Sequence, residues 1–370
     1  MIITILDRNY EPVDVIDAYT SFIWTDRYNT PGDFEYCNMA SKDILSKFVK
    51  DYFLQIEDSD HTMIIEDYEV VTDYENGNTL KIVGRSLESI LDRRIVWETT
   101  DIDGNLQNGI KKLINDAIIS PSDPNRKIPN FIFQDSNDSR ITNLTMNHQY
   151  TGDNLLTIVQ DICAANDIGF KIILNQDNNM VFSLYVGEDR SYAQEDNEYV
   201  VFKPSYNNVI TTKFTEINSG EKNVTLVAGE DRQFSASEEN QTLSIDEKET
   251  VRITRVIGFG YGLDRRELYT DARDLQKEED MSDEEYLSKL DQRGVEKLDE
   301  ASIEQKFDGQ YETMKMFRYG RDFFIGDTVQ VADEFGNEAP SKIIEYIFSH
   351  NESGFESYPT FRAYSSHDNY

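Results

Sequence analysis

The chain has 370 residues, of which 70 are acidic and 36 are basic, so its formal net charge at pH 7 is −34. Such a negative surface repels phosphate backbones and anionic lipid headgroups, which disfavours direct binding of nucleic acid or membranes. Hydrophobic residues make up 38% of the chain and aromatic residues 12%, more than an acidic disordered protein carries. The composition therefore predicts a globular protein of two or three domains.

Cys37 and Cys163 are the two cysteines of the chain, too few for a disulfide framework or a structural zinc site. We expect both to be buried free thiols. The first residues read as a strand and a turn rather than a signal peptide, and no apolar run is long enough to span a membrane. We therefore expect a protein that folds in a reducing cytoplasm and does not insert into a membrane.

Residues 1–98 alternate between short β patterns and two brief helical ones. Turn residues separate β-rich segments at 2–6, 13–17, 22–28, 34–39, 52–57 and 63–74, which predicts antiparallel strands. Ser41 is the expected N-cap of a short helix. The pair Asn76–Gly77 predicts a hairpin between 66–73 and 79–84. With a second short helix over 86–94, this segment is expected to form a small β-barrel with a helix against it.

Residues 99–200 carry two amphipathic helical patterns and then two β segments. The apolar faces consist of Leu106, Ile110, Leu113, Ile114, Ala117 and Ile118, and of Leu155, Leu156, Val159, Ile162 and Cys163. Asp153 is the expected N-cap of the second helix and Gly169 its expected end. Strands are predicted at 170–174 and 181–186, so we expect an α+β domain.

The remaining residues are mostly β-like, with one helical stretch. Strands are predicted at 199–202, 209–216, 223–229, 250–259, 302–310, 314–319, 328–332, 341–349 and 358–364. Residues 235–249 read as an exposed acidic loop. Residues 271–301 read as helical, with a capping box formed by Ser282 and Glu285.

These patterns predict a β-rich α+β fold with four parts. Residues 1–98 are expected to form a first antiparallel β-barrel, and residues 201–260 with 302–370 a second one. Residues 99–200 are expected to form a peripheral α+β domain, and residues 261–301 a helical insertion.

Motifs for catalysis, metals or cofactors are absent from the sequence. The four histidines, at 61, 148, 350 and 367, have no partner at metal-ligand spacing. Nucleophile-elbow, P-loop and dinucleotide-binding patterns are missing, and Gly258–Gly262 reads as a tight bend. Residues 101–105 begin like a calcium loop without its continuation, which favours a solvated turn. We therefore predict no catalytic, metal-binding or cofactor-binding residue.

Seven motifs occur along the chain in an order typical of one family. They are Asp153–Leu156 leading to Ile168–Phe170, Val186–Ser191, Val200–Phe202, Ala228–Glu230, Gly262–Glu267, Asp271–Asp274 and Tyr319–Asp327. Over nearly its whole length the chain resembles the Gp37-like tail proteins of siphophages. These belong to the wider group of phage tail hubs and tail-associated lysin N-terminal domains, and they resemble the baseplate hub of contractile phages.

The resemblance implies a structural virion protein of the tail tip rather than an enzyme. Three chains with two similar barrels each would form a homotrimeric ring that matches a sixfold tail tube on one side and a threefold tip on the other. Its implied partners are the distal tail ring protein and other tail-tip or receptor-binding proteins. DNA would pass through without specific binding, and acidic residues that face the channel would prevent it from sticking. Cleavage of the host wall is expected from another protein or from a longer chain.

The family motifs supply the candidate structural or interface residues. Gly187 and Gly326 would allow sharp turns, and Asp322 and Asp327 would hydrogen-bond to the backbone of those turns. Arg265 and Arg266 would bridge subunits through carboxylates. The other candidates in these motifs are Asp189, Arg190, Asp264 and Glu267.

Two other functions are compatible with the sequence. Abundant Tyr, Asn and Asp would suit a cell-wall polysaccharide hydrolase or a carbohydrate-binding protein, which an aromatic-lined cleft with two carboxylates would favour. The base of a prophage-derived or type VI-like spike would share the hub architecture.

Overall fold

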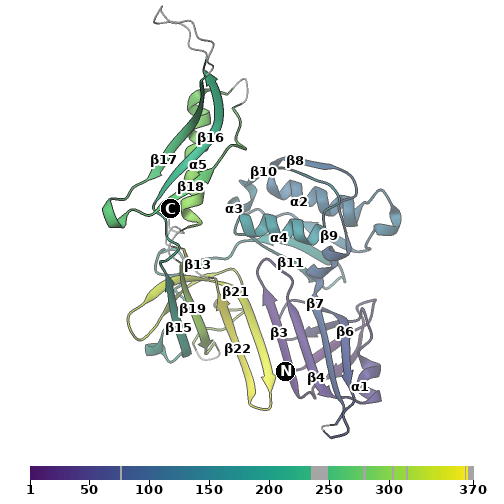
Figure 1. Ribbon diagram of the computed structural model, residues 1–370. Coiled ribbons are helices and arrows are strands. Elements are labelled where there is room, and N and C mark those ends of the chain that lie inside the picture. The colour runs from purple at the N-terminus through teal and green to yellow at the C-terminus, as the bar shows by residue number, and fades with distance from the viewer. Residues whose placement is uncertain are drawn as a thin grey trace, which may run out of the picture. The chain divides into compact units, whose positions relative to one another are not determined.

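The computed structural model describes residues 1–75, 77–234, 249–277, 281–301, 304–313, 316–362 and 364–365 (Figure 1). Contacts divide the chain into two compact units. Unit 1 comprises Met1–Lys213 and Phe307–Arg362, and unit 2 comprises Phe214–Lys306 and Ala363–Tyr370. The predicted strand-rich α+β class is confirmed. The finer division into four domains is not tested by this grouping and stays a prediction.

A twelve-stranded sheet forms the framework of unit 1. Its N-terminal strands are β1 (Ile3–Leu6), β2 (Pro12–Ile16), β3 (Ser21–Arg27), β4 (Asp33–Met39), β5 (Phe53–Ile56), β6 (Met63–Val71) and β7 (Thr79–Ser86). Its other strands are β13 (Asp189–Arg190), β14 (Val201–Phe202), β20 (Thr328–Ala332), β21 (Glu338–Asn351) and β22 (Gly354–Phe361). The hairpin predicted around Gly77 is confirmed, because β6 and β7 pair from Met63↔Ser86 to Val71↔Thr79, while Asn76 lies outside the described residues.

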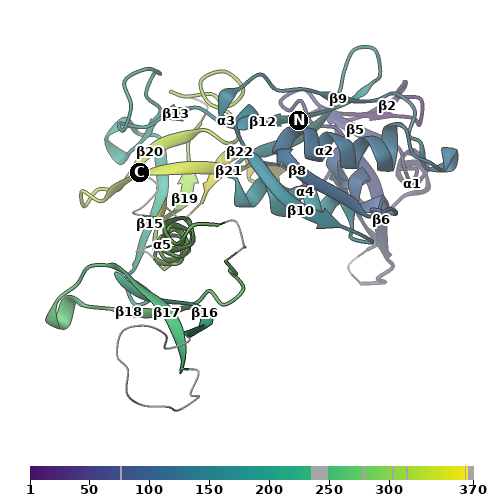
Figure 2. The same cartoon turned by 90° about the horizontal axis from the view of Figure 1, so that it is seen from above.

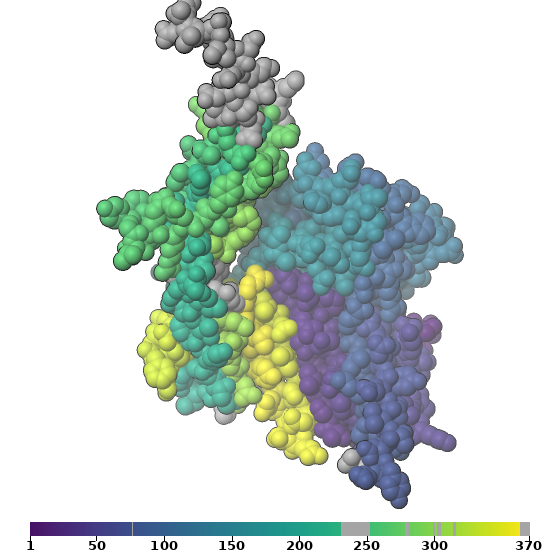
Figure 3. All heavy atoms as spheres, viewed as in Figure 1, coloured from purple at the N-terminus to yellow at the C-terminus, as the bar shows by residue number. Residues whose placement is uncertain are grey.

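Strands from the two ends of the chain meet in the middle of this sheet. β21 pairs antiparallel with β3, from Glu345↔Arg27 to Asn351↔Ser21. In Figure 3 the yellow C-terminal strands lie directly beside the purple N-terminal ones. The two predicted barrels are not confirmed: the pairing order runs openly from β13 to β2, and the described strands form no closed barrel. Local periodicity cannot show that strands about 320 residues apart share one ladder.

Two short helical segments accompany the N-terminal strands. α1 (Lys42–Lys47) begins at Ser41, whose side chain accepts a hydrogen bond from the Ile44 N–H, as predicted. The segment predicted as a helix over 86–94 is the 3₁₀ helix η1 (Leu87–Arg93), which is buried over its first five residues.

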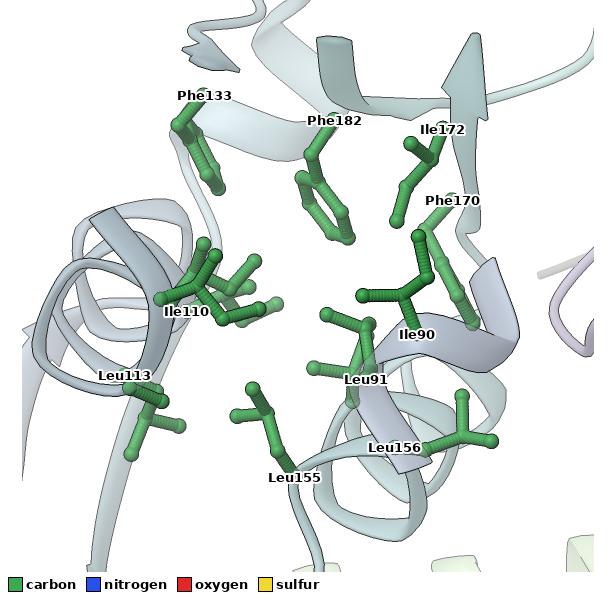
Figure 4. Packing of buried hydrophobic residues seen from close by; sticks show 14 of the residues in the cluster. Ile90, Leu91, Ile110, Leu113, Phe133, Leu155, Leu156, Phe170, Ile172 and Phe182 are labelled. Carbon is green, nitrogen blue, oxygen red and sulfur yellow. The ribbon is translucent and has the colours of Figure 1, made fainter. Parts of the chain in front are cut away.

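The central part of unit 1 packs helices and small sheets around one core. Its helical elements are α2 (Leu106–Ile114), the π-helical turn η2 (Asn115–Ile119), the 3₁₀ turn η3 (Pro124–Arg126), α3 (Ser139–Thr142) and α4 (Leu155–Ala165). Its strands are β8 (Thr100–Asn105), β9 (Phe131–Gln134), β10 (Thr145–Tyr150), β11 (Gly169–Leu174) and β12 (Met180–Tyr185). In Figure 4, Ile110 of α2, Leu155 of α4, Leu91 of η1 and Phe182 of β12 converge on this core. Both predicted apolar faces are buried, and Cys163 is a buried free thiol while Cys37 is half-buried.

Three local predictions for this region were wrong. Asn154, not Asp153, caps α4, because its side chain accepts from the N–H groups of Leu156 and Thr157. Asp153 instead accepts from the Thr151 N–H. Gly169 does not end α4, which stops at Asn166, but opens β11. The segment 101–105, interpreted as a solvated turn, lies in β8, which pairs with β10.

Unit 2 contains one long helix against a three-stranded sheet. α5 (Asp283–Asp299) has the predicted capping box between Ser282 and Glu285. The sheet consists of β16 (Val224–Phe234), β17 (Glu249–Gly258) and β18 (Glu267–Asp271), with the turn η5 (Gly262–Asp264) before β18. Figure 2 looks nearly along α5, which covers one face of this sheet. The helix predicted from Asp271 begins only at Asp283, and residues 235–248 of the predicted loop lie outside the described residues.

The chain runs between the units along β15 (Val209–Ile217), after the turn η4 (Pro204–Tyr206), and along β19 (Glu304–Tyr311). With β23 (Tyr364–Ser365) these strands form a further sheet. The strand predicted over 314–319 is not found among the described residues 316–319, where only an isolated bridge joins Tyr319 to Phe323.

Candidate functional site

Gly187 and Gly326 meet where the central part of unit 1 joins the C-terminal strands. A Cβ atom on Gly187 would lie 1.9 Å from the carbonyl oxygen of Gly326. Gly326 itself has φ of +91°, and its Cβ would lie 2.4 Å from the ring of the buried Tyr28. Because no larger residue fits either position, these glycines let two backbone segments pass in direct contact.

Asp327 stabilises the place where the backbone segments of Gly187 and Gly326 cross, called the glycine crossing below. Its side chain is buried, and its carboxylate accepts hydrogen bonds from the Glu188 N–H at 2.7 Å, the Phe324 N–H at 3.0 Å and Arg190 Nε at 2.8 Å. Arg190 and Asp189 form β13, which pairs in parallel with β20. A buried carboxylate with two backbone donors and one guanidinium partner is strongly held, because loss of Arg190 would leave its charge uncompensated.

Asp189 and Asp322 stabilise neighbouring turns. Asp189 accepts from the Ser191 N–H at 2.8 Å. Asp322 accepts from the Arg318 N–H at 2.7 Å and pairs with the Arg321 guanidinium at 2.6 Å. The hydrogen bonds from Arg321 lower the pKa of Asp322, so its carboxylate stays ionised at neutral pH.

The other four candidates lie in unit 2 and form a separate group. Arg265 pairs with Glu267, and Arg266 pairs with Glu221. The Asp264 carbonyl accepts from the side chain of Asn223, which in turn accepts from the Arg266 N–H. Both arginines therefore have carboxylate partners within their own chain, and their role between subunits stays a prediction.

A buried ionic cluster that the sequence analysis missed lies in unit 1. Asp26 of β3, His61 before β6 and Glu88 of η1 are all more than 90% buried. His61 Nδ1 lies 3.3 Å from Glu88 Oε1, which also accepts from the Ile172 N–H of β11 at 2.7 Å. Asp26 accepts from Trp24, Ser59 and Tyr319. One signal could have revealed Asp26: it continues the inward alternation of Phe22 and Trp24 along β3.

The electrostatics of this cluster favour a protonated histidine. Burial lowers the pKa of His61, but the nearby charges of Asp26 and Glu88 outweigh it and raise that pKa from 6.5 to about 9. Burial raises the pKa of Glu88, yet the charge of His61 lowers it overall. Burial raises the pKa of Asp26. Both shifts favour the charged forms, an imidazolium at His61 and a carboxylate at Glu88, which lie 3.3 Å apart.

His61 of the ionic cluster, and Gly187 and Asp327 of the glycine crossing, line one cavity. It has a volume of about 620 Å³, and its lining includes His61, Tyr185, Gly187, Tyr319 and Asp327. The part of the chain that the structure describes holds no group of three or more potential metal ligands. Within the same residues, no helix is long and apolar enough to span a bilayer. The residues around this cavity hold the segment 187–190 against the start of β20.

The comparisons with known proteins agree on one kind of protein. A family model described as Siphovirus ReqiPepy6 Gp37-like protein matches residues 2–361. The tail protein from Neisseria meningitidis MC58 superimposes with a TM-score of 0.59 at 12% identity, covering 97% of this chain and 95% of that chain. A 43 kDa prophage tail protein from Shewanella oneidensis gives 0.57 at 12% identity, covering 98% of each chain. A prophage tail protein from Listeria monocytogenes EGD-e gives a TM-score of 0.55 at 12% identity, covering 99% of this chain and 95% of that chain. A search of curated proteins finds no match.

We predict that the two motif aspartates differ in their effect on stability. Asp327→Asn should lower the free energy of unfolding by about 3 kcal/mol, because it leaves Arg190 without its buried counter-ion. Asp322→Asn is the matched control and should cost about 1 kcal/mol or less, since its ion pair is largely solvated. Urea unfolding measures both values, and equal effects would contradict the fastening role of Asp327.

We also predict a pH dependence from His61. A raised pKa means that the stabilising contribution is complete below about pH 6.5 and is lost as the pH rises through about 9. The free energy of unfolding should therefore fall by up to about 3 kcal/mol over this range. His61→Gln should remove this slope, whereas exposed His148→Gln should leave it intact. Denaturant unfolding at a series of pH values gives the slopes, and a slope unchanged by His61→Gln would exclude His61 as its source.

Proposed function

The chain belongs to the Siphovirus ReqiPepy6 Gp37-like protein family, and we propose that it acts as the hub of a phage tail tip. It is a structural phage tail protein and thus a virion component. In the proposed hub, three copies form a ring that adapts a sixfold tail tube to a threefold tip and lets DNA pass. The neighbours of this ring are the distal tail ring protein on one side and tail-tip or receptor-binding proteins on the other.

The observation that carries the proposal is the open edges of the large sheet. At one end of the strand order, β2 pairs only with β1 among the described strands. Val13 and Val15 of β2 are 51% and 55% exposed, with Ile2 nearby in sequence at 56%. An unpaired edge with exposed apolar side chains is a template for another chain. A ring closes through heterologous contacts, in which one edge of a copy meets a different edge of the next copy, so each chain needs two such edges.

A second open edge lies on the outer half of β6. β5 pairs with β6 only at Met63 and Ile64, so the segment from Asp67 to Val71 pairs with β7 alone among the described strands. Tyr68, Val70 and Val71 in this segment are exposed. Natural proteins rarely leave such an edge free in the assembled state, which supports contacts between copies in the proposed ring.

We predict that the protein associates through β2. Native mass spectrometry should show a species of three times 42.9 kDa, alone or with its distal tail ring partner. The double substitution Val13→Lys and Val15→Lys should abolish this species, because charge on an edge strand blocks pairing with another chain. Leu226→Lys on β16, a strand paired on both sides where the residue is 41% exposed, is the matched control and should assemble normally. A chain that stays monomeric in the presence of that partner would contradict the ring.

We further predict that the assembled protein does not retain DNA. Each copy carries a net charge of −34, so a ring of three repels phosphates without hindering their passage. Gel-shift measurements with double-stranded DNA at low and physiological salt should show no complex. Binding that weakens steeply as salt increases would reveal a basic DNA-contacting surface and count against transient passage.

A further inference from the structure

A polar pocket lies on the central part of unit 1. It is formed by the segment 95–100, the C-terminal part of α2 with the turn η2, and the following loop as far as Arg126. Its volume is about 380 Å³, which is within the range of small-ligand sites, roughly 300–1,000 Å³. Neither the family motifs nor the proposed ring assigns a role to it.

An exposed tryptophan marks the rim of the pocket. Trp97 is 53% exposed, whereas Trp24, the other tryptophan of the chain, is fully buried. The Arg126 guanidinium lies 4.2 Å from the centre of the Trp97 ring and donates to the Ile95 carbonyl at 2.6 Å. The cation therefore holds the indole in place while much of the ring surface stays open to solvent. A fixed, solvent-facing aromatic surface is typical of a recognition site.

The floor of the pocket is rigid. Val96, Leu113 and Ala117 line it and are at most 5% exposed. All three belong to the main hydrophobic core, where Figure 4 shows Leu113 on α2. A pocket whose floor is part of a packed core is formed before any ligand arrives, so binding costs little conformational entropy.

The walls define the chemistry of the occupant. The charged lining residues are Glu98, Asp116, Lys112 and Arg126, two acids and two bases, so the pocket has no net formal charge. Hydroxyl groups of the exposed Ser120 and Ser122 add donors and acceptors. An uncharged ligand with many hydroxyl groups and one apolar C–H face matches this lining, and anionic ligands are repelled by the net charge of the chain.

We propose that this pocket binds an uncharged saccharide. The sugar ring stacks on Trp97, while its hydroxyl groups donate to Glu98 and Asp116 and accept from Lys112. This binding site would give a structural tail protein a direct contact with glycans. The proposal does not rest on the ring, since the whole pocket lies within residues 95–126 of one chain.

Titration of the purified full chain with neutral trisaccharides tests the proposal. The probes are the trimers of glucose, galactose and N-acetylglucosamine, with tryptophan fluorescence as the readout. At least one should give a saturable change with Kd of about 1 mM or tighter. The change should come from Trp97 because Trp24 is buried. A lack of saturable change with all three trimers would overturn the proposal.

Variants measured by saturation-transfer NMR locate the site. Trp97→Ala should weaken binding about tenfold or more, and Trp97→Phe should weaken it less, because a smaller aromatic face remains. Asp116→Asn should also weaken binding, since a neutral amide is a poorer acceptor than a carboxylate. Phe335→Ala removes an aromatic ring that is 83% exposed and lies outside the pocket, so it should bind like the wild type.

Circular dichroism verifies that each variant is folded. Unchanged binding in folded Trp97→Ala would place the sugar elsewhere and overturn the proposal. If Trp97 instead becomes shielded from a soluble quencher when the protein assembles, the pocket is a protein interface and the saccharide proposal is wrong. A lack of sugar binding would leave the mass of the assembled species unchanged. The saccharide proposal and the proposal of a three-chain ring can therefore fail separately.

Discussion

The buried ion pair between His61 and Glu88, with Asp26 beside it, is the constraint on which unit 1 depends. Burial of an isolated charge costs several kcal/mol, and only close partners offset that cost. Here the partners come from β3, the loop before β6 and η1, with further hydrogen bonds from β11 and Tyr319. Glu88 receives its hydrogen bond from Ile172 only when η1 and β11 are in place, and Asp26 receives that of Tyr319 only when β3 and the C-terminal part are in place. The cluster therefore couples these segments within unit 1.

The same coupling explains why the motif residues are structural. Gly187 and Gly326 let two backbone segments touch, and Asp327 bonds the segment 187–190 to the start of β20. Gly187 and Asp327 line the same cavity as His61 of the ionic cluster. Rigidity at this point would suit the proposed hub, in which fixed sheet edges contact neighbouring chains. A ring built from open sheet edges requires that these edges do not move relative to one another.

Charge has two different uses in unit 1. In the ionic cluster the charges pair with each other away from water, which favours one arrangement of the chain. In the pocket beside Trp97, acids and bases of equal number remain at the surface, where they can hydrogen-bond to a neutral ligand. The first use contributes to the fold and the second is available for binding, although the same residue types serve both.

The sequence by itself determined the local elements. The Asn76–Gly77 pair, the Ser282–Glu285 capping box and the apolar faces of α2 and α4 depend on neighbours within a few residues, and the structure confirms the hairpin and these helices. Only the tertiary structure decided that β21 pairs with β3 and that Asp26, His61 and Glu88 meet in the interior. The physical reason is distance along the chain. Hydrogen-bonded ladders and buried ion pairs join residues tens to hundreds of positions apart, and periodicity or spacing in one segment carries no information about its distant partner.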